Sequence, residues 1–432
     1  MIVPRAYRYR VYPTPEQAAR LAQWDGALRF LWNVANEQRE HAGRRVRDDR
    51  RAPTAFDQIN ELTALRAEFP WLAEVPRNVS AQVLVELDTA WQRFFKGLTA
   101  RPRFRRKGRD RSPLIEPHPG AFRVEGTGRE GAVVFPKLGS LRAVIHRPLG
   151  GKPKRCTLVR EANQWFASIA CEVELPDVLP SQKPAVAIDR GIALLLADSS
   201  GGVVENPRHA EVIQARIARA QRAVARRKKG SKNQQKATER VACLHRKVRR
   251  QRAHTLHIAS KHYAKSHGVV ILEALSVKGM MASASGTIEE PGVNVAQKRG
   301  LNRSIAGAGW SLFEQMLRYK AVPEGGRVLD VPPAFSSQTC SVCGVVDADS
   351  RVSQSRFRCT ACGHEENADV NAAKVLLVRG MSALAVEATV TVCGGLANGR
   401  PVKQKLRVVR RGTRPGVGAS VVDTGAHRST YG

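Results

Sequence analysis

Two closely spaced cysteine pairs in the last quarter of the chain constrain its fold more than any other feature. The pairs are Cys340 and Cys343 in TCSVCG, and Cys359 and Cys362 in RCTACG. Each Cys-x-x-Cys turn aims two thiolates at one point, and two such turns joined by a short hairpin provide four soft donors, the set that zinc prefers. Gly344 and Gly363 follow the pairs and ease the tight path of the backbone. We therefore predict a zinc ribbon with one structural Zn²⁺, whose closed ligand set leaves no position for catalysis.

The balance of charge indicates the kind of partner. Lys and Arg number 71 against 38 Asp and Glu, which leaves a net charge of +33. Such a field favours a polyanion, so RNA binders, DNA-processing enzymes and proteins of anionic membranes stay open. The sequence has no apolar run of about 18 residues, and its first residues, MIVPRAYRYRVYP, lack the apolar core of a signal peptide. We therefore expect a protein that neither spans a membrane nor is exported.

Two basic stretches are candidates for contact with nucleic acid. Residues 99–112 combine basic side chains with Gly and Pro, which indicates a loop, and residues 208–254 are helical in pattern and crowded with Arg and Lys. Dense like charges repel unless an anion neutralises them, which favours contact with phosphate. A solvated linker and a solvated helical hairpin are the alternatives. The predicted contact residues are Arg101, Arg103, Arg105, Arg106 and Lys107 in the first stretch, and Arg226, Arg227, Lys228 and Lys229 in the second.

The part of the chain before residue 180 predicts a small β domain with a helical insertion. Tyr7, Tyr9 and Val11 alternate with arginines, a period of two that indicates a strand with one buried face. Thr14 and Gln17 have the spacing of a capping box, and apolar side chains at helical spacing follow. We interpret Trp and Phe on these helices as core residues rather than base-stacking ones. Short strands between about 120 and 180 favour a small antiparallel barrel or sheet, which the opening strand could complete.

Three acidic residues each stand where a regular element begins or ends among apolar neighbours. Asp189 ends the run AVAI, Glu273 ends VVIL, and Asp369 lies at a helix start in ENADVNAAKVLL. An acid in such a place is costly to desolvate unless something compensates its charge. Three converging carboxylates would bind Mg²⁺ or Mn²⁺ and could support two-ion cleavage of phosphodiester bonds. For each acid alone, a solvent-facing strand end or a helix cap is the alternative.

Taken in order along the chain, these pieces resemble the TnpB family, the RNA-guided endonucleases of bacterial insertion sequences that are related to miniature type V CRISPR effectors. The matching pieces are YRYRVYPTPEQ, RPRFRRKGR, FPKLGSLR, AIDRGI, VILEALSVKGM, SSQTCSVCG and CTACGHEENADVNAAKVLL. The resemblance implies that Asp189, Glu273 and Asp369 are the catalytic acids of a RuvC nuclease domain with an RNase H-like fold. It also implies a guide RNA that pairs with double-stranded target DNA beside a short motif, and cleavage that uses magnesium. Arg190 stands where many relatives carry an apolar or small residue, and we interpret it as tolerated variation.

The resemblance further implies the domain organisation of an α+β multidomain protein. The expected domains are a wedge-type β-barrel (1–13 and 113–180), a helical recognition domain with the basic loop (14–112), the RuvC nuclease domain (181–335 and 367–380) and the zinc ribbon (336–366). The resemblance does not extend to the tail (381–432), whose segments GGLANGRP, VVRRGTRPG and TGAHRSTYG lead us to expect poor order. We expect a nucleoid-associated protein of the bacterial or archaeal cytoplasm. Whether one or two copies bind each RNA stays open.

Three other functions fit part of the sequence. An RNA-guided DNA-binding repressor with weak or no cleavage would share every binding feature. A DNA transposase acting without RNA would share the acids, because that chemistry uses the same fold. A basic ribosome-associated zinc-ribbon protein fits the charge and the cysteines but leaves the acids unexplained. Because all three acids are present, an RNA-guided DNA endonuclease is the favoured prediction.

Overall fold

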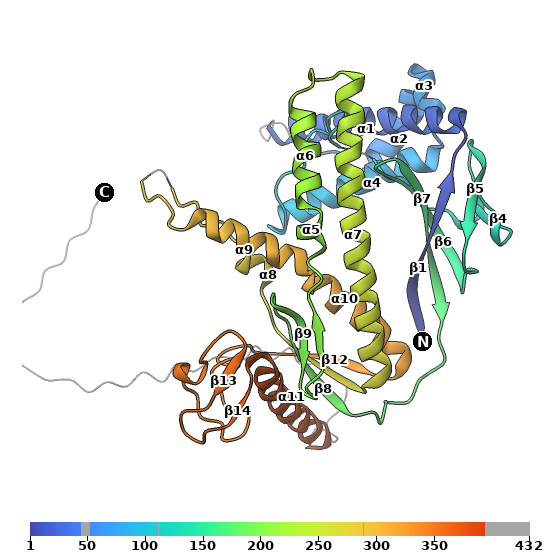
Figure 1. Ribbon diagram of the computed structural model, residues 1–432. Coiled ribbons are helices and arrows are strands. Elements are labelled where there is room, and N and C mark those ends of the chain that lie inside the picture. The colour runs from blue at the N-terminus through green and yellow to red at the C-terminus, as the bar shows by residue number, and fades with distance from the viewer. Residues whose placement is uncertain (45–51, 111, 288, 394–432) are drawn as a thin grey trace, which may run out of the picture. The chain divides into compact units, whose positions relative to one another are not determined.

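The computed structural model describes residues 1–44, 52–110, 112–287 and 289–393 (Figure 1). Residues 1–381 form one compact unit that contains two large sheets, their helices and a small cysteine-bearing hairpin. This mixed architecture confirms the predicted α+β class. Within the described ranges, no helix combines the length and the apolar character that a membrane span requires.

The first sheet is antiparallel, and the opening strand of the chain lies in its interior. Its strands are β1 (Ile2–Tyr12), β2 (Leu114–Glu116), β3 (Arg123–Glu125), β4 (Gly128–Phe135), β5 (Gly139–Ile145), β6 (Lys152–Glu161) and β7 (Gln164–Glu174), with the turn η1 (Pro119–Ala121) after β2. β1 pairs with β5 on one side and with β7 on the other. Tyr7, Tyr9 and Val11 are buried while Arg8 and Arg10 are exposed, so the predicted alternation is confirmed. The order β2-β6-β7-β1-β5-β4-β3 places β1 between β7 and β5, so the expectation that the opening strand completes this small antiparallel β domain is confirmed.

Among the residues that the structure describes between β1 and β2, four helices are inserted. They are α1 (Pro15–Arg44), α2 (Ala55–Glu68), α3 (Pro70–Ala73) and α4 (Arg77–Phe95). The Thr14 N–H donates to Oε1 of Gln17 at 3.0 Å and the Gln17 N–H donates to Oγ1 of Thr14 at 3.2 Å, which confirms the capping box. Trp24 of α1 and Leu87 of α4 are buried in one apolar cluster with the sheet. Phe95 is 73% exposed, so the core interpretation is wrong for this residue at the end of α4.

The second sheet is mixed and has the strand arrangement of the expected RNase H-like domain. Its strands are β8 (Ala185–Asp189), β9 (Leu194–Asp198), β10 (Val203–Glu205), β11 (Val269–Glu273) and β12 (Arg327–Val331). Their order is β10-β9-β8-β11-β12, with β8, β11 and β12 parallel and β9 antiparallel to its neighbours. Because parallel strands end at the same edge of a sheet, β8 and β11 deliver their last residues to one place.

Helices cover both faces of this sheet. The helices concerned are α7 (Lys232–Ser266), α10 (Trp310–Ala321) and α11 (Ala368–Cys393). Ile188 and Leu272 are buried in a cluster with residues of α7 and α10. Ala187 and Ile271, one position earlier in each strand, are buried with Leu376 of α11. Successive residues of a strand point to opposite faces, and here both faces are apolar, which explains why β8 and β11 are continuous apolar runs in the sequence.

The remaining helices lie between these strands. They are α5 (His209–Val212) and α6 (Gln214–Ala225) before α7, then α8 (Val277–Met280), α9 (Val295–Ala308) and η2 (Val322–Glu324) around α10. α6 and α7 form a helical hairpin within the basic stretch 208–254 (Figure 1). Gly309 has a φ of +74° and separates α9 from α10, a conformation that suits glycine.

The cysteine region is a small hairpin that leads directly into α11. It contains η3 (Ala348–Ser350), β13 (Arg356–Arg358) and β14 (Glu365–Asn367). Oδ1 of Asn367 accepts the N–H of Asp369 at 3.0 Å and so caps the helix. α11 continues to Cys393, past the predicted boundary at 380, because residues 381–386 are rich in helix-forming Ala, Leu and Met. The rest of the predicted tail, 394–432, lies outside the described residues.

Candidate functional site

The three predicted acids meet at one edge of the second sheet. Asp189 ends β8, Glu273 ends its parallel neighbour β11, and Asp369 lies in the first turn of α11. The carboxyl groups of Asp189 and Glu273 are within hydrogen-bonding reach of each other, and Asp369 is close enough to interact electrostatically with both. A Cβ atom on Gly191 would lie 3.6 Å from Oδ2 of Asp369, so the start of α11 reaches the loop that follows β8.

Burial and repulsion oppose negative charge at this site. Desolvation is the largest cause that raises the pKa of Asp189 far above its ordinary value, and the neighbouring Glu273 and Asp369 raise it further. Desolvation also raises the pKa of Asp369, although Arg351 opposes this shift with its Nη2 3.4 Å from Oδ1 of Asp369. Ionisation of Asp189 and Asp369 at this site is therefore favoured only when a nearby cation compensates their charge.

Arg190 directly follows Asp189, and its side chain connects the end of β11 to α10. Its side chain is only 1% exposed, and Nη1 pairs with Oε2 of Glu314 on α10 at 3.2 Å. Its Nη2 donates to the main-chain carbonyl of Glu273, and its own N–H donates to Oε1 of Glu273 at 3.3 Å. A buried guanidinium with such partners contributes to the arrangement of the site.

The four cysteines form a compact cluster. Sγ of Cys340 lies 3.7 Å from Sγ of Cys362, and Sγ of Cys343 lies 3.5 Å from Sγ of Cys359. A tetrahedral ion with four sulfur ligands at about 2.3 Å separates its sulfurs by about 3.8 Å, so these distances suit one. Among the described residues, this is the one group of three or more His, Cys, Asp or Glu side chains whose ligand atoms all lie within 4.8 Å of one another.

The two cysteine turns have the same backbone geometry. Gly344 and Gly363 have φ values of +74° and +73°, which confirms the predicted role of these glycines. Their N–H groups each donate at 3.0 Å to the carbonyl of the first cysteine of the pair. In the second turn the N–H of Cys362 donates to Sγ of Cys359 at 3.4 Å, and this bond is the largest of the causes that lower the pKa of that thiol to about 6. Thiolates are the zinc ligands, so this hydrogen bond favours metal binding.

Asn371 ties the cysteine cluster to the acids. It is completely buried, two residues after Asp369. Its Nδ2 donates to the carbonyl of Thr339 at 2.8 Å, and its Oδ1 accepts the N–H of Ser341 at 2.9 Å. These two residues flank Cys340, so the first cysteine turn and the helix that carries the third acid are held together. Sequence reasoning missed this role, although its position in DVNAA is a signal.

The basic loop divides into packed and exposed residues. The Arg105 guanidinium lies 3.6 Å from the ring centre of Trp32 and donates to Oγ of Ser112 at 2.8 Å. This side chain is 15% exposed and belongs to the packing of the loop. Arg101 and Arg103 are 46% and 60% exposed and remain candidates for phosphate contact. Arg106 and Lys107 are also exposed.

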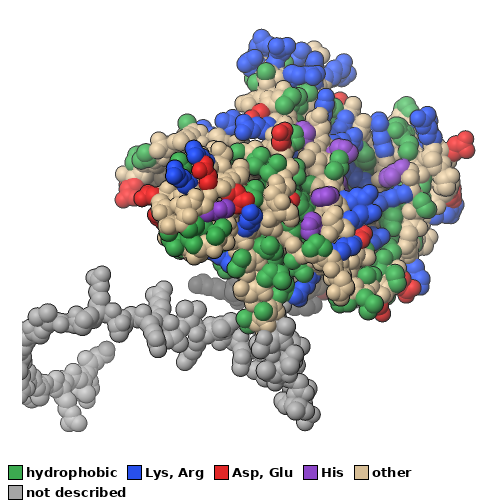
Figure 2. Space-filling model, turned by 60° about the horizontal axis from the view of Figure 1, so that its bottom comes forward, with side chains coloured by type: hydrophobic (Ala, Val, Ile, Leu, Met, Phe, Trp, Pro, Cys, Tyr) green, Lys and Arg blue, Asp and Glu red, His purple; other side chains and the backbone are tan. Residues whose placement is uncertain are grey.

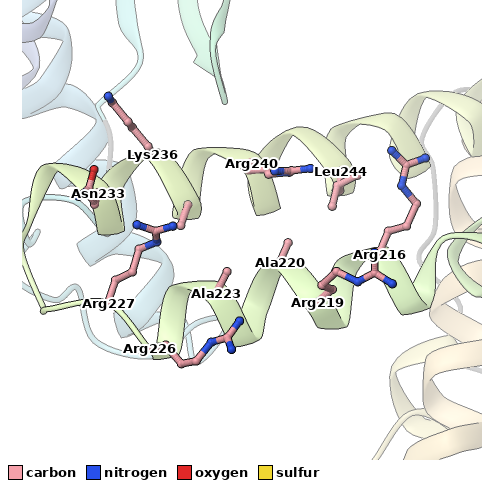
Figure 3. A pocket seen from close by; sticks show the side chains of 11 residues that line it. Arg216, Arg219, Ala220, Ala223, Arg226, Arg227, Asn233, Lys236, Arg240 and Leu244 are labelled. Atoms are coloured by element: carbon pink, nitrogen blue, oxygen red, sulfur yellow. The ribbon is translucent and has the colours of Figure 1, made fainter.

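The turn of the α6–α7 hairpin carries the second predicted basic group. Arg226 and Arg227 line a groove between the two helices, whereas Lys228 and Lys229 are exposed residues outside its lining (Figure 3). Sequence reasoning missed the other cations of this groove, which are Arg216, Arg219, Lys236 and Arg240. The signal was present as basic residues three or four apart, which share one face of a helix.

Comparison with known proteins agrees with this geometry. A family model described as "Probable transposase" (OrfB_IS605) matches residues 168–284, and one described as "Cas12f1-like, TNB domain" matches 310–376. A third, described as "Helix-turn-helix domain", matches residues 1–45, which the structure shows as β1 and α1. A cryo-EM structure of a Cas12f1-sgRNA-target DNA complex shares the fold, with a TM-score of 0.50 at 12% identity over 87% of this chain and 98% of that one.

Two relatives match almost end to end. InsQ of Escherichia coli strain K12, named as a proposed RNA-guided DNA endonuclease, is 33% identical over 93% of this chain and 97% of its own. A Streptomyces pristinaespiralis protein with the same kind of name is 32% identical over 89% of this chain and 91% of its own. The mixed sheet, the acids at its strand ends and the cysteine hairpin define a protein of the RuvC nuclease class. Within that class, the chain belongs to the TnpB family, also called OrfB of IS605.

Proposed function

We propose that this protein is an RNA-guided DNA endonuclease. The observation that carries the proposal is the meeting of Asp189, Glu273 and Asp369 at one sheet edge, in a chain whose near full-length relatives are named for this activity. Net positive charge supports nucleic-acid partners, because the protein must hold a guide RNA and a target duplex. Base pairing with the guide would select the sequence, and the protein would supply backbone contacts and recognition of a short adjacent motif.

The same three acids would hold the catalytic metal. Their hard oxygen donors suit Mg²⁺ or Mn²⁺, and the repulsion that raises the pKa of Asp189 is what a divalent cation relieves. Held by Asp189, Glu273 and Asp369, two such ions would supply an activated water and stabilise the leaving oxygen of phosphodiester hydrolysis. Arg351 would neutralise charge beside Asp369.

The cysteine cluster would hold one structural Zn²⁺. Its four soft donors, their spacing and the hydrogen bond to Sγ of Cys359 suit a tetrahedral thiolate site. All ligand positions come from the protein, so the ion would stabilise the ribbon and, through Asn371, the start of α11.

A plasmid assay tests the proposal. The protein is purified with a co-expressed guide RNA and mixed with a plasmid that carries the matching target, with Mg²⁺ or with EDTA. We expect linearisation with Mg²⁺ alone, loss of cutting in Asp189→Ala, and guide binding unchanged in that variant. Asp330→Asn is the matched control, since it neutralises a strand acid of β12 outside the trio.

Other outcomes of this assay identify the rival functions. Target binding without linearisation under either condition would show an RNA-guided repressor. Joined DNA products without a requirement for RNA would show a transposase, the activity that the family description prints. Full cutting by Asp189→Ala would refute the assignment of the acids.

A further inference from the structure

Trp310 joins the start of α10 to the loop that follows the first acid. The residue is only 4% exposed, so it belongs to the interior and not to the surface that Figure 2 shows, where Lys and Arg side chains gather at the top of the view. Its indole Nε1 donates to the main-chain carbonyl of Gly191 at 3.3 Å. Gly191 is two residues after Asp189. The indole N–H therefore reaches the backbone of the acid site from a helix that carries none of the three acids.

Hydrogen bonds from different parts of the chain hold this loop at three consecutive residues. The N–H of Arg190 donates to Oε1 of Glu273 at 3.3 Å. The carbonyl of Ile192 accepts from Nδ2 of Asn206, just after β10, at 2.8 Å. The carbonyl of Gly191, between these two residues, accepts the indole N–H. Because each bond comes from another element, the path of the loop is fixed peptide by peptide.

Gly191 lies between α10 and the third acid. A Cβ atom on Gly191 would come 3.6 Å from Oδ2 of Asp369 and 2.6 Å from the carbonyl oxygen of Leu194. The second distance is well inside van der Waals contact, so the loop can follow this path because residue 191 has no side chain. Trp310 belongs to the apolar cluster of Ile188 on one face of the sheet, whereas α11 packs on the other face. The Gly191 carbonyl is therefore held toward α10, while Asp369 approaches from α11.

The direction of this carbonyl affects the charge and the spacing of the site. A carbonyl oxygen carries partial negative charge, and one that turned toward Asp369 would add to the repulsion among the carboxylates. Movement of the loop would also shift Asp189, which lies two residues earlier, relative to Asp369. The spacing of these acids must match a pair of ions about 3.5–4 Å apart. A bond that fixes the Gly191 peptide thus acts on both properties.

Burial of a tryptophan in this protein does not by itself provide a partner for the indole N–H. Trp24 is 1% exposed, and its Nε1 has no hydrogen-bond partner among the described residues. A phenylalanine at position 310 would fill the apolar part of the same space but would give the loop no donor. The bond to Gly191 is therefore a specific feature of Trp310 and not a general result of packing.

We propose that Trp310 is a positioning residue of the nuclease site. Its indole N–H holds the peptide of Gly191, and the loop in turn holds Asp189 at the distance from Asp369 that divalent cations require. The inference rests on the proposed function for the chemistry of the site. It adds a residue that acts through the loop and not by contact with the substrate.

Trp310→Phe tests this role, because it removes the indole N–H and keeps an aromatic ring in the core. The full-length protein with its guide RNA is titrated with Mn²⁺ in a calorimeter, and the same titration of Asp189→Ala supplies the heat of ions bound elsewhere, including the RNA. Groups that orient metal ligands contribute about 10–100-fold to metal affinity. We expect Trp310→Phe to weaken Mn²⁺ binding at the acids about 10-fold. The Mg²⁺ concentration for half-maximal cleavage should rise by a similar factor, and excess Mg²⁺ should recover much of the rate.

Trp91→Phe is the matched control. It removes an indole hydrogen bond, to Oδ1 of Asn36 at 3.0 Å, from a tryptophan that is 6% exposed and lies in the helical insertion. Both variants should lose a similar, small amount of thermal stability, so weaker Mn²⁺ binding confined to Trp310→Phe supports the positioning role. Gly191→Ala is a second test, since it leaves Trp310 intact and displaces the same peptide through the contact with Leu194. It should weaken Mn²⁺ binding as well.

The other outcomes are equally definite. Unchanged Mn²⁺ affinity in Trp310→Phe or in Gly191→Ala, or an equal loss in Trp91→Phe, would overturn the positioning role. A complex that binds Mn²⁺ at the acids but leaves a matched plasmid uncut would refute the proposed endonuclease, whereas the role of Trp310 would still be decided by calorimetry. If the unaltered complex bound no more Mn²⁺ than Asp189→Ala, both would be refuted.

Discussion

The guanidinium of Arg190 donates a hydrogen bond to the main-chain carbonyl of Glu273, so the residue that follows the first acid holds the strand end that carries the second. The same guanidinium pairs with Glu314, which also accepts from Arg318 at 3.0 Å. α10 is thereby connected to the edge where β8 and β11 end.

Removal of the hydrogen bond between Arg190 and Glu273 should lower the rate of cleavage and leave guide binding unchanged. Arg190→Met leaves the Glu273 carbonyl and part of Glu314 without a partner, which costs about 1–3 kcal/mol of stability. Displacement of Glu273 by even about 1 Å can lower the rate about 100-fold. We expect single-turnover cleavage to fall by that order while guide binding is unchanged. Arg318→Met is the control, since it removes the other partner of Glu314 and leaves the Glu273 carbonyl bond intact. Equal rates for Arg190→Met and the unaltered protein would exclude the positioning role.

The pH dependence of stability should reveal the buried acids. The pKa of Asp189 is raised in the folded protein, so between its ordinary value and the raised one the folded state binds more protons than the unfolded state. Stability in EDTA should therefore fall as pH rises through this window, by about 1.4 kcal/mol for each pKa unit of displacement. Mg²⁺ should restore stability most at high pH, since the ion takes the place of protons.

Thermal unfolding at pH 6, 7 and 8, with EDTA or Mg²⁺, measures this effect. Asp189→Asn cannot ionise, so its melting temperature in EDTA should depend less on pH and be higher at pH 8. A variant with the same slope as the unaltered protein would show that Asp189 is not the group responsible.

Disruption of the cysteine cluster should also disturb the position of Asp369, because hydrogen bonds of Asn371 hold the first cysteine turn to α11. Cys359→Ser removes a thiolate whose pKa is already lowered, and we expect the roughly one zinc per chain to fall to near zero by metal analysis. Cys243→Ser is the control, because Cys243 lies outside the cluster. Asn371→Leu should retain zinc but lose cleavage, because it cuts the hydrogen bonds between the first cysteine turn and α11. Retention of full cleavage by Asn371→Leu would separate the ribbon from the active site.

The close approach of α11 to the sheet should make Gly380 intolerant of a side chain. A Cβ atom there would come 2.4 Å from Cδ1 of Ile271, which is completely buried in β11. We expect Gly380→Ala to destabilise the protein by about 1–3 kcal/mol through overpacking. Adding Ile271→Val, which removes that methyl group, should recover part of the loss in chemical denaturation. If the changes in the free energy of unfolding of the two single variants simply added in the double variant, the contact between Gly380 and Ile271 would not be the cause of the destabilisation.

Local features could be predicted from the sequence because short-range rules decide them. The alternation of Tyr7, Tyr9 and Val11, the capping box at Thr14 and the turns at Gly344 and Gly363 each depend on neighbours a few residues away. No comparable short-range rule predicts which residues far apart in the chain come into contact. Phe95 stands in a sequence pattern typical of the core but is exposed, and Arg105 stands in a pattern typical of the surface but is largely covered. Both outcomes depend on which elements pack beside these residues.

The sequence by itself determined the four thiolates of the ribbon, the apolar strands with an acid at their ends, and the charge that calls for a polyanion. Those properties follow from residue type and spacing. Only the tertiary structure decided that Asp189, Glu273 and Asp369 share one sheet edge, that Arg190 supports them, and that the arginines of α6 and α7 face a common groove. The physical reason is that parallel strand pairing and helix packing bring together residues far apart in the chain, and no local pattern encodes which of them meet.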